Sequence, residues 1–119
     1  MQILKRLWNC CSTAFARGIS CCFAAMAAAP RIAHILGELV KGFCQKRPLP
    51  AELASSIGED WAKDLQQGLP VIDLTANCAV ITAIVNDIDG ASMFAQQVIA
   101  YAAPGDVLIA ISTSGNAEN

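Results

Sequence analysis

From Pro30 onward, apolar positions recur in patterns that predict helices alternating with short strands. Pro30 suits the first turn of a helix, and the apolar stripe of this helix consists of Ile32, Ile35, Leu36, Leu39, Val40 and Phe43. The sequence KRPLP at 46–50 is expected to end that helix. A second, weaker amphipathic helix is predicted over 51–67, ending at Gly68.

The second half of the chain continues this alternation. LPVIDL at 69–74 is typical of a short buried strand, and 75–87 is predicted to be a helix that a Thr or Asn caps. Another helix is expected over 91–102 and a final strand over 106–111. Helices that alternate with short apolar strands predict an α/β protein with a parallel sheet and helices on both faces.

Size and composition limit the possibilities. The chain has 119 residues, enough for one domain, and hydrophobic residues make up 55% against 6% aromatic. A formal net charge of −2 gives no electrostatic argument for nucleic acid or an anionic membrane as a partner. The apolar stretches of the first 33 residues are too interrupted to span a bilayer, so no membrane partner is expected.

The amino-terminal segment differs from the rest in charge and cysteine content. Residues 1–37 contain four basic residues and no acidic one, and four of the six cysteines lie in two adjacent pairs within the first 22 residues. Adjacent pairs without CxxC spacing indicate neither a zinc site nor a redox motif. We therefore divide the chain into an atypical segment, 1–33, and an orderly one, 34–119, which has the composition of a cytoplasmic domain. A signal peptide or an acid-free transit peptide remains an alternative for the first segment.

Three motifs carry a family resemblance. GDVLIAISTSGN at 105–116, HILGELVKGF at 34–43 and ND at 86–87 resemble the sugar isomerase (SIS) domain family. Within it, the sequence is most similar to the phosphoheptose isomerases, which convert sedoheptulose 7-phosphate into an aldoheptose phosphate. The resemblance covers 34–119, about the middle of a full-length member. It implies a fragment of a three-layer, flavodoxin-like α/β/α sandwich.

The resemblance also implies a binding site for a phosphorylated sugar. The residues it assigns to the substrate are Asn86, Asp87, Ser112, Thr113, Ser114 and Asn116. Hydroxyl groups and backbone N–H groups in such a turn can surround a phosphate. Ala117 stands where these isomerases usually have another serine, so one donor is missing. Without the resemblance, STSGN is equally typical of an ordinary turn.

His34 and Glu38 stand four positions apart, hence on one face of the first predicted helix. In metal-dependent relatives these two residues bind zinc, and the glutamate moves the substrate proton. Isomerisation of an aldose and a ketose through an enediolate needs such a base, together with a partner acid. The family's partner histidine and a further glutamine ligand lie in a carboxyl-terminal half that we do not find here. A solvated helical pair is the alternative interpretation of His34 and Glu38.

The family's first strand and its glycine-rich loop, of the form CGNGGSAAD, are also not recognisable before His34. Residues 24–33 allow codons whose neighbouring frame reads Cys-Gly-Asn-Gly-Gly-Ser-Ala-Ala-Asp-Ser. We therefore hypothesise that roughly 7–33 is translated out of frame and that the frame is restored near His34. The hypothesis predicts a chain that lacks its first strand.

The sequence is compatible with three functions. The first is a phosphosugar isomerase domain whose activity is impaired, with zinc as a cofactor and a homo-oligomer, tetrameric in full-length relatives, as its assembly. The second is a non-catalytic SIS module that binds sugar phosphates or a protein. The third is an unrelated small protein with a targeting peptide.

Overall fold

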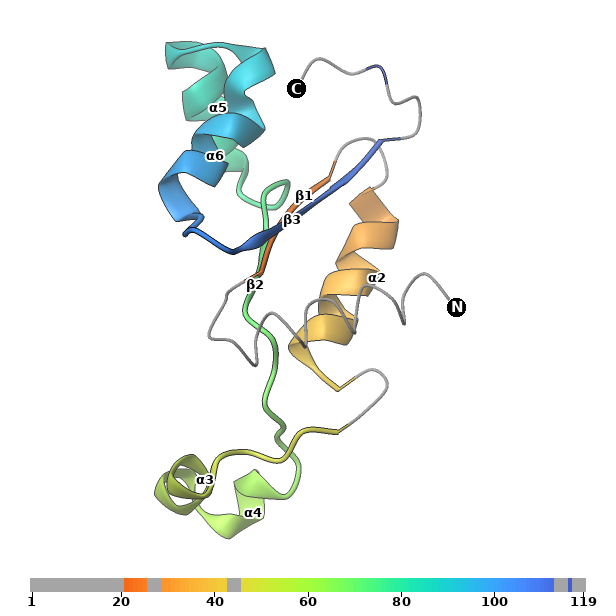
Figure 1. Cartoon of the computed structure of the whole chain (residues 1–119), viewed down its shortest axis with the longest axis vertical. Coiled ribbons are helices and arrows are strands. Elements are labelled where there is room, and N and C mark those ends of the chain that lie inside the picture. The colour runs from red at the N-terminus through yellow and green to blue at the C-terminus, as the bar shows by residue number, and fades with distance from the viewer. Residues whose placement is uncertain (1–20, 26–28, 43–45, 113–115, 117–119) are drawn as a thin grey trace.

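The computed structural model describes residues 21–25, 29–42, 46–112 and 116, with side chains from His34 onward (Figure 1). The elements in chain order are β1 (Cys21–Ala25), α2 (Ala29–Val40), α3 (Ala51–Ile57), α4 (Glu59–Ala62), β2 (Val71–Asp73), α5 (Cys78–Asp87), the 3₁₀ turn η1 (Gly90–Ser92), α6 (Met93–Tyr101) and β3 (Val107–Ile111). The predicted alternation of helices and strands is confirmed.

The three strands form one parallel sheet in the order β2-β1-β3. β1 lies in the centre, and Cys21 is in register with Val71 on one side and with Val107 on the other. The prediction that the chain lacks its first strand is therefore wrong, because residues 21–25 supply the strand that joins the other two. The parallel sheet and the α/β class agree with the prediction.

One face of the sheet packs against α2. Leu36 and Leu39 of α2 form a buried cluster with Leu69, and the half-buried side chains packed against it are Ile35, Val71, Val107, Ile109 and Ile111. Alternate residues of β3 thus contribute to this core, as expected for a strand, in which successive side chains point to opposite faces. Val40, which was expected in the apolar stripe, is mostly exposed.

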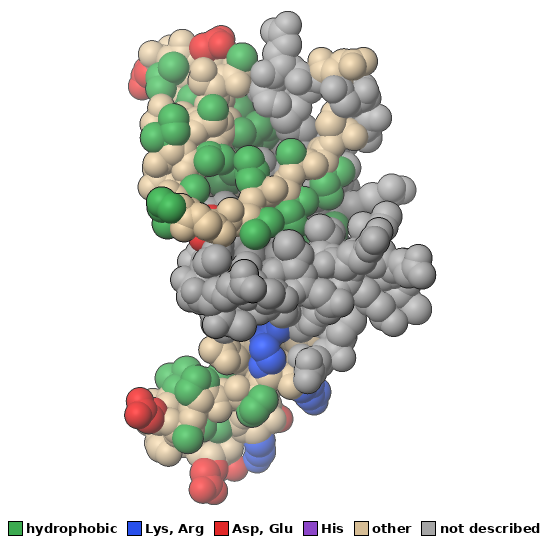
Figure 2. Space-filling view, in the orientation of Figure 1, with side chains coloured by type: hydrophobic (Ala, Val, Ile, Leu, Met, Phe, Trp, Pro, Cys, Tyr) green, Lys and Arg blue, Asp and Glu red, His purple; other side chains and the backbone are tan. Residues whose placement is uncertain are grey.

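The opposite face is covered only in part. Leu74 and Phe94 form a second buried cluster with Met93 and Val98 of α6. On β3, however, Leu108 is 51% exposed, and Ile72 of β2 is also exposed. Hydrophobic side chains accordingly reach the surface over the region of α5, α6 and β3 (Figure 2).

The helix predicted over 51–67 is divided into two. Gly58 separates α3 from α4 and has a φ angle of 90°, a left-handed conformation that glycine adopts without the steric cost of a side chain. The continuous helix was therefore a wrong prediction. α3 and α4 contact each other and form an arm, 51–65, that extends away from the sheet (Figure 1).

The segment that connects the arm to the sheet lies against the end of α2. The Arg47 guanidinium donates to the Gln67 carbonyl oxygen at 2.8 Å and to the Leu39 carbonyl oxygen at 3.4 Å. Burial lowers the pKa of Arg47. A Cβ atom at Gly68 would collide with the Val40 carbonyl oxygen, so this close approach requires a glycine.

Two polar side chains hold α5 and α6. Asn77 caps α5 by accepting a hydrogen bond from the Val80 N–H at 3.2 Å, which agrees with the predicted Thr or Asn cap. The buried Gln97 of α6 donates to the carbonyl oxygens of Leu74 at 3.0 Å and Met93 at 2.9 Å. Among the described residues, the helices are all too short or too polar to cross a membrane.

Candidate active site

The candidate site lies where the three parallel strands end. β1, β2 and β3 end at Ala25, Asp73 and Ile111, so their carboxyl ends share one edge of the sheet. Ser112 follows β3 directly and is exposed at this edge, and Asn116 is exposed as well. The predicted ligands Thr113 and Ser114 lie outside the described residues. In parallel sheets, the edge at the carboxyl ends is where ligands ordinarily bind.

Helix α2 begins near the same edge, four positions after the end of β1. Since a helix rises about 1.5 Å per residue, His34 lies about 7.5 Å and Glu38 about 13.5 Å along the axis from Ala29. His34 is exposed and Glu38 is half-buried. Both residues therefore lie on one helix that begins four positions after the carboxyl end of β1, and His34 lies nearer than Glu38 to the start of that helix.

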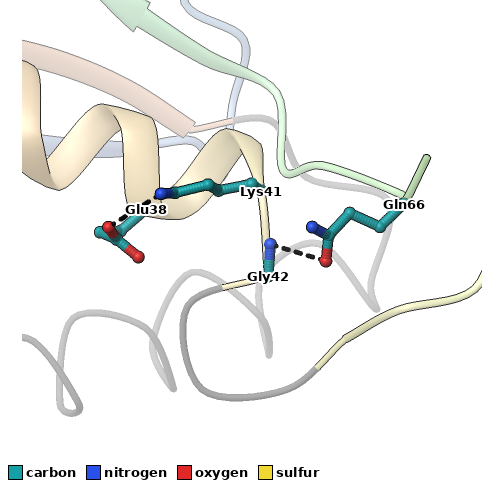
Figure 3. A network of polar contacts seen from close by, with 4 residues as sticks. All are labelled: Glu38, Lys41, Gly42 and Gln66. Atoms are coloured by element: carbon teal, nitrogen blue, oxygen red, sulfur yellow. Dashed lines mark hydrogen bonds and ion pairs between the residues drawn. The ribbon is translucent and has the colours of Figure 1, made fainter. Parts of the chain in front are cut away.

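The Glu38 carboxylate has a partner that the sequence reasoning missed. Its Oε1 atom lies 3.3 Å from the Lys41 Nζ atom, and its side chain is only 18% exposed (Figure 3). The spacing of three positions between Glu38 and Lys41 on a predicted helix was the signal for this ion pair in the sequence. Next to this pair, the Gln66 side chain accepts a hydrogen bond from the Gly42 N–H at 3.0 Å, which joins the end of α2 to the chain before β2.

Asn86 and Asp87 are not brought to α2 by any described contact. They form the last turn of α5, both are exposed, and α5 packs against η1 and α6. Their predicted contact with a sugar therefore depends on the position of α5 above the sheet edge (Figure 1).

Asp73 is a further polar residue at the sheet edge that sequence reasoning did not single out. Its Oδ1 atom accepts hydrogen bonds from the Thr75 N–H at 2.8 Å and the Thr75 hydroxyl at 2.6 Å. It lines a shallow pocket of about 470 Å³ together with Ile72, Gln97 and Tyr101. An acidic residue that ends a buried strand was the signal in the sequence, because such positions fall at the sheet edge.

The described residues do not form a zinc site by themselves. His34 and Glu38 supply two donors, whereas a catalytic zinc ion takes three protein ligands and a structural one takes four. Within 34–42, 46–112 and 116, no three His, Cys, Asp or Glu side chains are grouped to hold a metal. Glu38 is moreover paired with Lys41. We therefore derive no chemical step through a metal.

Sequence comparison finds curated relatives, although no family model matches the chain. The chain is 40% identical over 86 residues to the phosphoheptose isomerase of Thermodesulfovibrio yellowstonii, a match that covers 72% of this chain and 33% of the relative. For the phosphoheptose isomerase of Geotalea daltonii the identity is 46% over 86 residues, with 72% and 35% covered. For that of Clostridium acetobutylicum it is 52% over 54 residues, with 45% and 28% covered.

A solved structure has a similar fold. Phosphoheptose isomerase GmhA from Neisseria gonorrhoeae superposes with a TM-score of 0.59 at 24% identity, over 99% of this chain and 49% of that one. At this identity the likeness concerns the fold alone. The sequence comparisons thus confirm the resemblance seen in the sequence, because the chain is similar to curated phosphoheptose isomerases at 40–46% identity over 86 residues. The chain spans about a third of the length of these relatives and about half of the solved structure.

Proposed function

We propose that the chain is a phosphosugar isomerase-type SIS domain, acting on a ketose phosphate of the sedoheptulose 7-phosphate type. The main support for the proposal is that the turn after β3 and the start of α2 both lie at the carboxyl ends of the strands. Ser112 follows β3 there, and α2 with His34 and Glu38 starts there. A phosphate beside Ser112 would leave the carbon chain of the sugar free to extend along α2.

In this proposal each residue has a separate task. Ser112, Thr113, Ser114 and Asn116 hold the phosphate, and Asn86 and Asp87 bind sugar hydroxyls. Glu38 takes a proton from C1 of the ketose, which forms an enediolate, and returns it to C2, while a proton passes from O1 to O2 with the help of an acid. The Lys41 Nζ atom lies 3.3 Å from this carboxylate, so the base would have to leave the ion pair or share it with the substrate.

The complete site requires groups from outside the described residues. The acid at the carbonyl oxygen and further ligands for zinc are the missing parts, so the zinc role of His34 and Glu38 stays a prediction. We propose that a homo-oligomer, or a longer chain, completes a three-layer α/β/α sandwich and this site. We expect impaired activity for the chain alone. A cytoplasmic location, and the lack of nucleic-acid and membrane partners, stay predictions too.

The proposal is tested by an isomerase assay on the purified chain with sedoheptulose 7-phosphate, with and without added zinc. Replacing a general base is expected to reduce turnover by about 10²–10⁴-fold, so Glu38→Gln should remove any activity present. Glu52→Gln, at an exposed position of α3, is the matched control and should keep the activity. Equal turnover in both variants would refute the role of Glu38.

A non-catalytic module is the second candidate, favoured by the ion pair that already occupies Glu38. It predicts that sedoheptulose 7-phosphate binds without being converted. Calorimetric titration should then show weaker binding for Ser112→Ala and unchanged binding for Ser55→Ala, which alters an exposed serine of α3. Binding with no turnover in the Glu38-intact chain, with or without zinc, would favour this function over the first.

A further inference from the structure

A pocket lies at the base of the α3–α4 arm. Its volume is about 320 Å³, at the small end of the range for small-molecule sites. Two segments form it, 46–48 before the arm and 62–66 at the end of the arm. Figure 2 shows Lys and Arg side chains on this part of the surface. The proposed isomerase site uses none of the residues that line this pocket.

Cationic side chains predominate in the pocket. Lys46, Arg47 and Lys63 line it, against a single carboxylate, that of Asp64. Lys63 is paired with Asp60 at 2.9 Å, but the Asp60 side chain is 96% exposed. An ion pair in water is weak enough for the lysine to exchange its partner. The pocket therefore has an excess of positive charge, which favours an anionic ligand.

The protein itself holds the Arg47 guanidinium in place. Its Nε atom donates to the Gln67 carbonyl oxygen at 2.8 Å, and the Gln67 N–H donates to the Arg47 carbonyl oxygen at 3.0 Å. The Nη2 atom donates to the Leu39 carbonyl oxygen at 3.4 Å. A guanidinium held in this way loses little conformational freedom when it binds a ligand. Burial, which lowers the pKa of Arg47, disfavours its charge, so a bound anion would offset that cost.

The rest of the pocket offers a neutral donor and apolar walls. The Gln66 Oε1 atom accepts from the Gly42 N–H, so the amide nitrogen of Gln66 points away from that contact and can donate elsewhere (Figure 3). Pro48 and Leu65 supply apolar surface. A matching ligand has an anionic group with several acceptor oxygens, joined to a small apolar part.

We propose that this pocket binds a small organic phosphate monoester, with the phosphate between Lys46, Arg47 and Lys63 and the organic group against Pro48 and Leu65. A phosphate dianion suits these residues better than a carboxylate, because it carries more charge for the three cations and its oxygens can accept from a guanidinium in pairs. The ligand would connect the segments at the two ends of the arm. The site does not depend on the proposed isomerase function.

Titration of the full chain with phenyl phosphate, followed by its amide signals in NMR spectra, tests the proposal. Saturable shifts are expected at Lys46, Lys63 and the side-chain amide of Gln66, with a dissociation constant below about 10 mM. Phenyl phosphate should bind about threefold more tightly than inorganic phosphate, or better, because its ring leaves water. Phenol, which has the ring without the charge, should cause none of these shifts.

Charge substitutions distinguish this pocket from the proposed phosphate-binding turn at Ser112. Lys46→Met and Lys63→Met should each raise the dissociation constant by about three- to fivefold, as expected for exposed charge pairs. Asp64→Asn should lower it, because a like charge is removed from the pocket. Lys41→Met, which removes a lysine of α2 outside the pocket, and Ser112→Ala should leave it unchanged.

The Asp64→Asn variant covers the case in which a lysine variant disturbs folding, since tighter binding cannot result from unfolding. Shifts at Ser112 without shifts in the pocket would overturn the proposal while supporting the proposed phosphate turn. Affinity that neither lysine variant changes, or weaker binding by Asp64→Asn, would overturn it too. Equal affinities for phenyl phosphate and inorganic phosphate would exclude an organic monoester as the ligand. Absence of isomerase turnover would leave the expected shifts as they are.

Discussion

The two faces of the sheet differ in how the chain covers them. On the face toward α2, Val107, Ile109 and Ile111 pack against the buried leucines of α2 and against Leu69. On the other face, Leu108, between two of these residues, is half exposed, although α6 borders part of that face. The run of apolar residues in β3 is that of a strand buried on both faces. An apolar run in a strand thus indicates that both of its faces can be buried. Which face is buried depends on the segments that pack against it.

The strongest test introduces a charge on each face of the same strand. Ile109→Asp would place a carboxylate against Leu36 and Leu39, and an unpaired buried charge costs about 3–5 kcal/mol. Leu108→Asp should change the free energy of unfolding by about 1 kcal/mol or less, because that position reaches water. Urea unfolding of both variants measures the difference. Equal losses would mean that the second face is covered in solution.

Removing a buried side chain on the α2 side should give the second-largest loss in the free energy of unfolding. Leu39 is 2% exposed, and Leu39→Ala should lower the free energy of unfolding by about 2–5 kcal/mol, since a cavity remains. Ile72→Ala, on the other face, is the comparison and should cost clearly less. Both values come from denaturant titrations. A larger loss for Ile72→Ala would reverse the assignment of the covered face.

The attachment of α6 is tested at Gln97. Gln97→Met keeps a side chain of similar length but leaves the buried carbonyl oxygen of Leu74 without its donor, which costs about 1–3 kcal/mol. Gln96→Met, one position earlier on the same helix, is the control. Thermal and urea unfolding should show the loss for Gln97 alone. No loss would indicate that α6 is held by its apolar contacts.

The smallest effect is expected at the cap of α5. Asn77→Ala removes the acceptor of the Val80 N–H and should cost about 1 kcal/mol. Asn77→Asp retains a side-chain oxygen and should restore most of the stability. Circular dichroism during urea unfolding compares the two variants. Identical curves for alanine and aspartate would show that this cap does not stabilise the helix.

Helices and strands with a clear pattern of apolar residues could be predicted from the sequence. A strand that forms only by pairing with distant strands could not. α2 and β3 were foreseen from their apolar patterns, and the division at Gly58 had a signal in the Gly-Glu-Asp sequence that ends one helix and begins another. β1 was not predicted. Its apolar run, CCFAA, is only five residues long and stands in a segment without sustained periodicity, and it forms a strand because two other strands pair with it.

The candidate site was predictable in its layout but not in its details. Ser112 had to fall at the carboxyl edge once β3 was recognised as a parallel strand. The pairing of Glu38 with Lys41 was visible in the spacing but depends on the rotamers that packing selects. Whether Asn86 and Asp87 reach a sugar depends on how α5 stands above the edge, which periodicity alone does not determine.

The central place of β1 has a consequence for the order of assembly. Its neighbours are β2 and β3, and Cys21 pairs with Val107, near the other end of the chain. On the ribosome, the middle strand must therefore wait until residues 107–111 have been synthesised before its second edge is occupied, and pairings of such long sequence separation form slowly. During that interval the apolar edge of β1 is open to intermolecular association, so the yield of native protein should depend on how fast the chain between β1 and β3 is synthesised.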